Sequence, residues 1–123
     1  MLEKDCIFCQ PQNRNYLLEN QTAGLLLDIH PVSPGHALII AKQHYPTFFD
    51  LPLNVRMDMN TLLDEAKTYL DQRYHPAGYN IDINVGPVGG QKIMHCHIHL
   101  IPRYHYEDQQ QTTLQKYLPL DLT

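Results

Sequence analysis

The residues of this chain that best suit chemistry are three histidines at alternate positions. His95, His97 and His99 occur in the run His-Cys-His-Ile-His, and they are three of the eight histidines in 123 residues. Because successive side chains of a β-strand point to opposite faces, we expect the three imidazoles to line one face of a strand. The other face, which begins with Cys96 and Ile98, is predicted to be core. Imidazole acts as a base, a nucleophile or a metal ligand near neutral pH, so this strand is a candidate reaction centre.

Three interpretations of this histidine strand are open from the residues alone. The row can be a hydrogen-bonded structural face, a catalytic metal site, or a nucleophilic imidazole whose neighbours orient it and bind an anion. A single ion held by all three side chains would have to draw together Cβ atoms that span roughly 13–14 Å along the strand. That span argues against one ion held by all three side chains, although two histidines at alternate positions of a strand can bind one metal. The remaining interpretation is covalent catalysis by one imidazole.

A glycine-rich loop precedes the histidine strand and supports the same interpretation. Gly86, Gly89 and Gly90 allow backbone conformations that bring N–H groups close to a ligand, and such groups can form a nest for an anion. Asn84 and Gln91 flank these glycines, and either side-chain amide can donate a hydrogen bond to a phosphoryl oxygen. Alone, the loop would be read as an ordinary hairpin turn. Together with the histidines it predicts a phosphate site.

Composition and charge exclude several classes of protein. Hydrophobic residues make up 43% of the chain and charged residues 18%, as in an ordinary globular domain. A net charge of −4 argues against a broad nucleic-acid-binding surface. There is no apolar run long enough for a membrane span, and the first residues do not resemble a signal peptide. We therefore expect a cytoplasmic protein, in which Cys6 and Cys9 are redox-active, metal-binding or unpaired thiols rather than a disulfide.

The apolar periodicity along the chain predicts a single α+β domain. Short apolar or alternating runs indicate strands, and one longer run with apolar residues three to five positions apart indicates a helix. The expected strands are residues 16–19 and 24–29, paired as a hairpin, then 36–41, 79–85 and 94–102, and the helix covers residues 52–73. We expect this helix to bury Leu53, Met57, Leu62, Ala66, Tyr69 and Leu70. The order indicates an antiparallel sheet, and residues 104–123 are predicted to be a C-terminal tail.

At this point the sequence resembles a known family. The run His-Cys-His-Ile-His-Leu-Ile matches the His-x-His-x-His-x-x pattern, with x hydrophobic, of the histidine triad (HIT) superfamily of nucleotide-binding hydrolases and transferases. The resemblance covers about residues 5–103, and its further motifs are Leu27-Asp28-Ile29, the run from Gly35 to Ile40, Lys42-x-His44, Asn84 and Gly89-Gly90-Gln91. The Cys-x-x-Cys start is similar to the Hint-like, bacterial-type branch. The resemblance implies one HIT domain over residues 1–123, with a five-stranded antiparallel sheet, one main helix and a homodimer that forms a ten-stranded sheet.

The resemblance also implies a reaction and assigns roles to residues. His97 would attack the α-phosphorus of a purine nucleoside phosphoramidate or related nucleotidyl conjugate, and water would then release the nucleoside monophosphate. His99 and His36 would bind phosphate oxygens and assist proton transfer. The implied substrate-binding residues are Asp28 at the ribose, and Asn84, Gly89, Gly90, Gln91 and His99. Two alternatives remain: a Fhit-like dinucleoside polyphosphate hydrolase, and a nucleotide-sensing regulatory protein without catalysis.

A structural zinc ion is the one cofactor that the resemblance implies, and no organic cofactor is expected. In similar bacterial proteins the ligands correspond to Cys6, Cys9, His44 and His95, a closed Cys₂His₂ set. His95 would then bind zinc and take no part in catalysis. One departure from the family pattern is Lys92, which stands where Hint-like proteins have a small hydroxyl residue near the phosphate. Its charge is expected to strengthen anion binding or to narrow the range of leaving groups.

Overall fold

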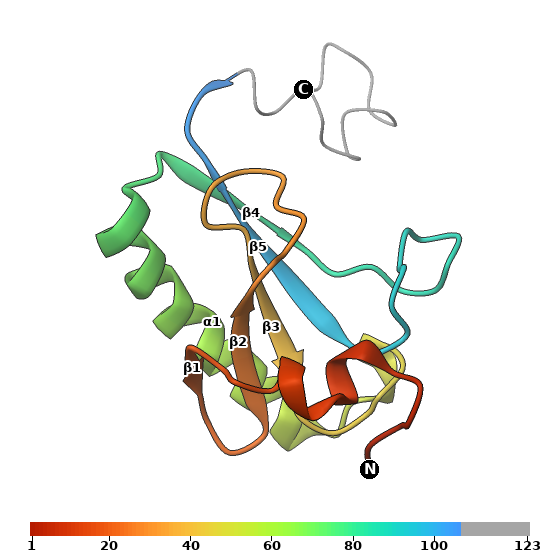
Figure 1. Cartoon of the computed structure of the whole chain (residues 1–123). Coiled ribbons are helices and arrows are strands. Elements are labelled where there is room, and N and C mark those ends of the chain that lie inside the picture. The colour runs from red at the N-terminus through yellow and green to blue at the C-terminus, as the bar shows by residue number, and fades with distance from the viewer. Residues whose placement is uncertain (107–123) are drawn as a thin grey trace.

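A five-stranded antiparallel sheet and one long helix form the framework of the protein (Figure 1). The computed structural model describes residues 1–106, so most of the predicted tail lies outside the described residues. The strands are β1 (Leu18–Glu19), β2 (Ala23–Leu27), β3 (Ala37–Ala41), β4 (Gly78–Asp82) and β5 (His97–Arg103), in the sheet order β1-β2-β3-β5-β4. The helix α1 covers Leu53–Tyr74, and three short 3₁₀ helices are η1 (Ile7–Cys9), η2 (Pro11–Asn13) and η3 (Phe48–Asp50). The predicted α+β architecture is confirmed.

The core lies between α1 and one face of the sheet (Figure 1). All five residues of β3 are buried, and Ile39 pairs with Leu25 of β2 on one side and with Ile98 of β5 on the other. Cys96 and Leu100 belong to the same core as Ile98, which confirms the predicted apolar face of the histidine segment. The opposite face of the sheet is therefore the one available for a binding site.

The helix begins and ends near the predicted residues but buries a different stripe at its start. Pro52 caps its N-terminus, and His75 ends it in the left-handed region with φ 52°. The buried residues follow the helical repeat without a break: Val55, Met59, Leu62, Ala66 and Leu70. Leu53 and Met57 are 73% and 61% exposed, so their predicted burial is wrong. They lie two positions from Val55 and Met59, which is more than half a turn around the helix. None of the helices in residues 1–106 is long and apolar enough to cross a membrane.

Strand β4 is shorter and more open than the alternating pattern predicts. It ends at Asp82 instead of residue 85, and its one neighbour is β5. Ile81, Ile83 and Val85 are 55%, 39% and 36% exposed, although an alternating pattern normally indicates a buried face. The edge of the sheet at β4 thus carries apolar side chains that nothing in residues 1–106 covers.

The histidine strand begins later than expected. β5 starts at His97, and the two preceding residues are held by the segment after β3. The N–H of Cys96 donates to the carbonyl oxygen of Tyr45 at 2.7 Å, and the carbonyl oxygen of Cys96 accepts from Ala41 at 3.3 Å. His95 therefore lies outside the regular strand, and the expectation that three imidazoles share one strand face holds for His97 and His99 alone.

Candidate active site and metal cluster

A cavity of about 550 Å³ opens at the start of β5 and contains two of the three triad histidines. His97 and His99 line it from β5, and His36 lines it from the residue before β3. Much of the remaining wall is apolar and comes from η1 and the end of β2, namely Ile7, Phe8, Leu26, Leu27 and Ile29. Such a mixture of an apolar wall and a few converging polar groups is typical of a small-molecule site.

His97 is held in one orientation by the backbone. Its Nδ1 lies 2.7 Å from the carbonyl oxygen of His95, and a carbonyl can only accept, so Nδ1 carries the proton. The Nε2 atom of the neutral ring therefore has a free lone pair. Burial lowers the pKa of His97 below its ordinary value, which keeps the ring neutral at neutral pH. The ring of Phe8 packs edge-on against it with centroids 5.2 Å apart. This arrangement suits an imidazole nucleophile.

His36 and His99 form a hydrogen-bonded pair whose proton positions can be assigned. The backbone N–H of Val32 donates to Nδ1 of His36 at 3.1 Å, so the proton of the neutral ring is on Nε2. That Nε2–H donates to Nδ1 of His99 at 2.9 Å. The proton of His99 is consequently on its own Nε2, where it can donate to a ligand in the cavity. A lone pair on His97 and a donor on His99 thus lie on the same strand.

Burial is also the largest cause of the low basicity of this pair. It lowers the pKa of His36, and it lowers the pKa of His99 to about 4, where the neighbouring rings of His97 and His36 further oppose protonation. Asp28 lies nearby, with Oδ2 at 3.6 Å from Nε2 of His36, and acts in the opposite direction. Both rings are therefore neutral at neutral pH and keep the assigned pattern of donors and acceptors.

The spacing of this pair argues for a hydrogen bond and against a shared metal ion. Asp28, His36 and His99 bring three potential ligand atoms within 4.8 Å of one another. Two imidazole nitrogens bound to one tetrahedral zinc would lie about 3.3 Å apart, given Zn–N bonds of about 2.0–2.1 Å. The observed separation of 2.9 Å is that of a donor and its acceptor.

The glycine loop uses its backbone N–H groups internally. The N–H of Gly89 and that of Gln91 both donate to the carbonyl oxygen of Gly86, and that of Gly90 donates to Pro87. The N–H of Gly86 donates to the side-chain oxygen of Gln91 at 2.9 Å. The predicted nest of free amides for a phosphate is therefore wrong for these four residues. Gly86 and Gly90 do have the positive φ values, 76° and 94°, that favour glycine.

The predicted substrate-binding residues divide into two groups. Asp28, Asn84 and Gly90 line the cavity together with His99, whereas Gly89 and Gln91 do not. Gln91 is 5% exposed, and its side-chain nitrogen donates to the carbonyl oxygens of Pro46 at 2.6 Å and Ile93 at 2.9 Å. Its amide has no donor left for a phosphate. Its contacts instead fix the segment that leads into β5.

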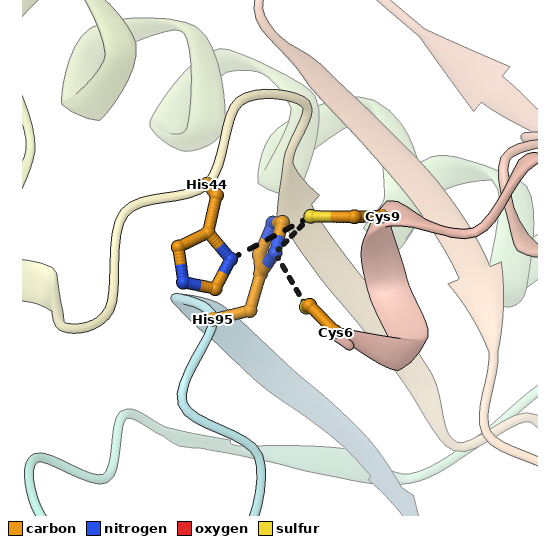
Figure 2. Close-up of side chains that lie close together, drawn as sticks. All are labelled: Cys6, Cys9, His44 and His95. Carbon is orange, nitrogen blue, oxygen red and sulfur yellow. Dashed lines mark hydrogen bonds between the residues drawn. The ribbon is translucent and has the colours of Figure 1, made fainter. Parts of the chain in front are cut away.

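A second cluster joins the N-terminal segment to the residue before β5. Figure 2 shows Cys6 and Cys9 facing His44, which follows β3, and His95. His95 is fully buried, and its Nε2 donates to the carbonyl oxygen of Ala41 at 2.6 Å, which leaves Nδ1 without a proton. This Nδ1 lies 3.2 Å from Sγ of Cys6 and 3.5 Å from Sγ of Cys9.

The geometry of this cluster fits a tetrahedral metal site. Sγ of Cys9 is also 3.5 Å from Nδ1 of His44, and all four ligand atoms lie within 4.8 Å of one another. Zinc bonds of about 2.3 Å to sulfur and 2.0–2.1 Å to nitrogen give sulfur–nitrogen edges of about 3.6 Å. The three cysteines of the chain are free thiols, so the pair is not a disulfide. The four predicted metal ligands are thus brought together, and burial lowers the pKa of His95 to about 4.

Comparison with known proteins identifies the chain. The model of the HIT domain matches residues 10–106. The chain belongs to the HIT family. An uncharacterised 16.1 kDa HIT-like protein of Mycoplasma pneumoniae is 34% identical over 108 residues, which cover 85% of this chain and 75% of that protein. Adenylylsulfatase HINT3 of Arabidopsis thaliana is 35% identical over 106 residues, which cover 83% of this chain but about half (54%) of that longer protein.

Solved HIT structures share the fold. A HIT family protein of Bacillus anthracis superposes with a TM-score of 0.79 at 28% identity, over 94% of this chain and 87% of that one. A Zn-bound histidine triad family protein of Mycobacterium smegmatis superposes with a TM-score of 0.75 at 28% identity, over 84% and 78% of the two chains. The five-stranded sheet with one main helix is therefore the HIT fold.

Two residues of the HIT cavity escaped the sequence analysis. Ile7 and Phe8 lie between the two cysteines of the metal cluster, and their side chains form part of the cavity wall. Their position in the sequence could have indicated this role. Two cysteines that bind the same metal ion would also fix the residues between them. His30, which is exposed, also lines the cavity.

Proposed function

We propose that this HIT protein hydrolyses purine nucleoside phosphoramidates or related nucleotidyl conjugates at the α-phosphate. The proposal rests on where the protons of two imidazole rings lie. Nε2 of His97 carries a free lone pair, and Nε2 of His99 carries a proton that it can donate, in the same cavity. Nucleophile and proton donor are the two groups that displacement at phosphorus needs. Adenylylsulfatase activity in the name of one relative is consistent with this class of reaction.

The proposed reaction has two displacements. Nε2 of His97 attacks the α-phosphorus, an N–P bond forms, and the bond to the leaving group breaks with its electron pair. The Nε2–H of His99 donates to a departing amine, and the hydrogen bond from Nε2–H of His36 to Nδ1 of His99 keeps His99 in the tautomer that carries this proton. Water then attacks the nucleotidyl-imidazole and gives its proton back to His99. This releases the nucleoside monophosphate and restores His97.

The nucleoside is proposed to occupy the apolar part of the cavity. Phe8, Leu27 and Ile29 supply an apolar wall for a base, and the carboxylate of Asp28 beside them can accept hydrogen bonds from both hydroxyls of a ribose. Asn84, on the segment that connects β4 with β5, is proposed to donate from its side-chain amide to the phosphoryl group, and Gly90 lines the same part of the wall. A purine is proposed as the base, because its larger ring system can bury more apolar surface against this wall than a pyrimidine can.

Zinc is the ion proposed for the cluster of Cys6, Cys9, His44 and His95. Two thiolates and two imidazoles in a tetrahedron are the ligands of a closed structural zinc site, which has no open position for substrate. A zinc ion held by these four residues would join the N-terminal segment to the residue before β5. It would thereby fix Phe8 in the cavity wall and would take no part in the displacement.

We propose that the protein forms a homodimer and that the exposed face at β4 and the start of α1 is the interface between the two copies. Leu53, Met57, Ile81 and Ile83 are all exposed there, and several of them line a second hollow of about 500 Å³. An exposed edge strand with apolar side chains pairs readily with another strand. Pairing of β4 with its counterpart in a second copy would give a ten-stranded sheet.

We also propose that residues 1–123 form one domain.

The test of the proposed reaction is to trap the intermediate. Mixing enzyme with adenosine 5′-phosphoramidate labelled at phosphorus, and quenching within milliseconds, is expected to leave label on His97. The His97→Ala variant should carry none and lose at least about 10³-fold in kcat. Nucleotide binding by the wild type without label or turnover would favour the sensor alternative and refute the proposal. Faster turnover of diadenosine polyphosphates would favour the second hydrolase alternative.

A further inference from the structure

Lys92 places a cation on the wall of the cavity. Among the described residues that line the cavity, it is the one lysine or arginine, and Asp28 is the one carboxylate. The ammonium group of Lys92 makes no hydrogen bond or ion pair with residues 1–106. Burial lowers the pKa of His36, His97 and His99, so these three imidazoles are neutral at neutral pH. Lys92 is therefore the one lysine or arginine of the described cavity wall that can balance a negative charge on a ligand.

The backbone at Lys92 is fixed although its side chain is exposed. Gln91, the preceding residue, is buried and makes three hydrogen bonds through its side chain. Ile93, the following residue, packs on the buried cluster that contains Phe8 and Leu38. A flexible ammonium group on an anchored backbone can follow a charged group as it departs while remaining at the cavity.

Lys92 comes from the segment of the wall that supplies polar groups. Asn84 and Gly90 lie on the same connection between β4 and β5, whereas Asp28 lies directly after β2, next to the lining residues Leu27 and Ile29. If the nucleoside occupies the wall near Asp28, as proposed above, the leaving group is directed toward the remaining polar wall. The charge of Lys92 then acts on the leaving group.

We infer that Lys92 selects nucleotidyl conjugates whose leaving group is an anion, such as sulfate or a phosphate chain, over those that release an amine. The inference rests on the proposed function and specifies its leaving group. When Nε2 of His97 displaces sulfate, the P–O bond breaks and sulfate leaves with the electron pair as a dianion without needing a proton. An amine leaves only after it receives a proton, which His99 supplies. Lys92 stabilises the charge that develops in the first case and has no such charge to stabilise in the second.

The test compares leaving groups on one nucleoside. The kcat/KM values are measured for adenosine 5′-phosphosulfate and for adenosine 5′-phosphoramidate, and their ratio is compared between wild type and variants. Lys92→Gln is expected to lower the ratio of sulfate to amidate about tenfold. Lys92→Arg should restore it to within about threefold, because the charge is retained. Lys67→Gln removes a lysine on the outer face of α1 and should leave the ratio unchanged.

Two further arms make the outcome decisive. Diadenosine tetraphosphate serves as a second anionic substrate: an equal tenfold loss for it indicates selection of anions, and a loss confined to the phosphosulfate indicates selection of sulfate. In a His97→Ala background the dissociation constants of the intact conjugates are measured by calorimetry, and the additional Lys92→Gln change should weaken the phosphosulfate about tenfold more than the amidate. This arm tests Lys92 even if the proposed hydrolysis fails. An unchanged ratio in both arms would overturn the inference.

Discussion

The Nδ1–H of His97 donates to the backbone carbonyl oxygen of His95 over 2.7 Å. One residue of this pair is the proposed nucleophile, and the other is a member of the metal cluster. The side chain of His95 is anchored by Cys6, Cys9 and the carbonyl oxygen of Ala41, so its backbone is also fixed. The candidate metal cluster is therefore linked to the ring of the proposed nucleophile through one peptide carbonyl, although none of its four residues lines the cavity.

The first prediction concerns this coupling. Cys9→Ser should remove the metal and lower kcat by about 10–100-fold, since groups that orient a reacting side chain have effects of this size. Elemental analysis of protein purified without added metal measures the first effect, and steady-state turnover measures the second. His97→Ala is the matched control, because it should lose activity and keep the metal. Full activity in a metal-free Cys9→Ser protein would contradict the coupling.

A second prediction follows from the hydrogen bond between His36 and His99. Without the Nε2–H of His36, the proton of His99 can move to Nδ1 and leave no donor in the cavity. His36→Ala should therefore lower kcat for adenosine 5′-phosphoramidate by about 10²-fold, the lower end of the usual range for general acid catalysis, with a smaller change in KM. His30→Ala is a suitable comparison, since His30 also lines the cavity, whereas the ring nitrogen of His99 is hydrogen-bonded to His36. Equal effects of the two substitutions would argue against this role of the hydrogen bond from His36 to His99.

Periodicity predicted which residues form the core, but not where each histidine lies. The apolar alternation of Cys96, Ile98 and Leu100 is a local property of the chain, and the structure buries all three. The place of His95 depends on hydrogen bonds from residues about fifty positions away, at Ala41 and Tyr45. No pattern of spacing contains that information. The resemblance to the HIT family did contain it, because it carried the cysteines and His44 along with the triad.

The errors at the glycine loop and at β4 have a different physical origin. Glycine content indicates where N–H groups can approach a ligand, but the loop closes on itself and uses those groups at Gly89 and Gly90. Alternation in β4 indicates a face that is buried somewhere, yet the chain alone leaves Ile81 exposed. Sequence patterns report the tendency of a segment to make contacts, and the fold determines which partner is available.

The third prediction concerns acid stability. His99 has a pKa of about 4 in the folded protein against 6.5 for an unperturbed histidine, because of burial and then of His97 and His36, while Asp28 and Asp82 act oppositely. Between these values the unfolded chain binds a proton that the folded chain does not, so stability is lost as the pH falls from 6.5 toward 4. The free energy of unfolding in urea should therefore drop between pH 7.5 and 5.0.

His99→Asn isolates the contribution of this group. The variant should lose less stability over the same pH range, with a difference on the order of 1 kcal/mol after allowance for solvent screening of a half-buried ring. Metal loss in acid affects both proteins and cancels in the comparison. Parallel pH curves for wild type and variant would show that His99 is not the group responsible.

The last prediction concerns the open edge of the sheet. Because Met57 and Ile81 expose large apolar surfaces beside an edge strand, we expect the protein to be a dimer in solution at about 50 μM, and light scattering coupled to gel filtration measures this. Ile81→Lys places an unpaired charge in the proposed interface and should raise the dimer dissociation constant by at least about tenfold. Val88→Lys changes an exposed valine of the glycine loop, which lies outside β4 and does not line the second hollow, and it should leave the dimer intact. A monomeric wild type, or equal dissociation of both variants, would show that the apolar edge of β4 is not a homodimer interface.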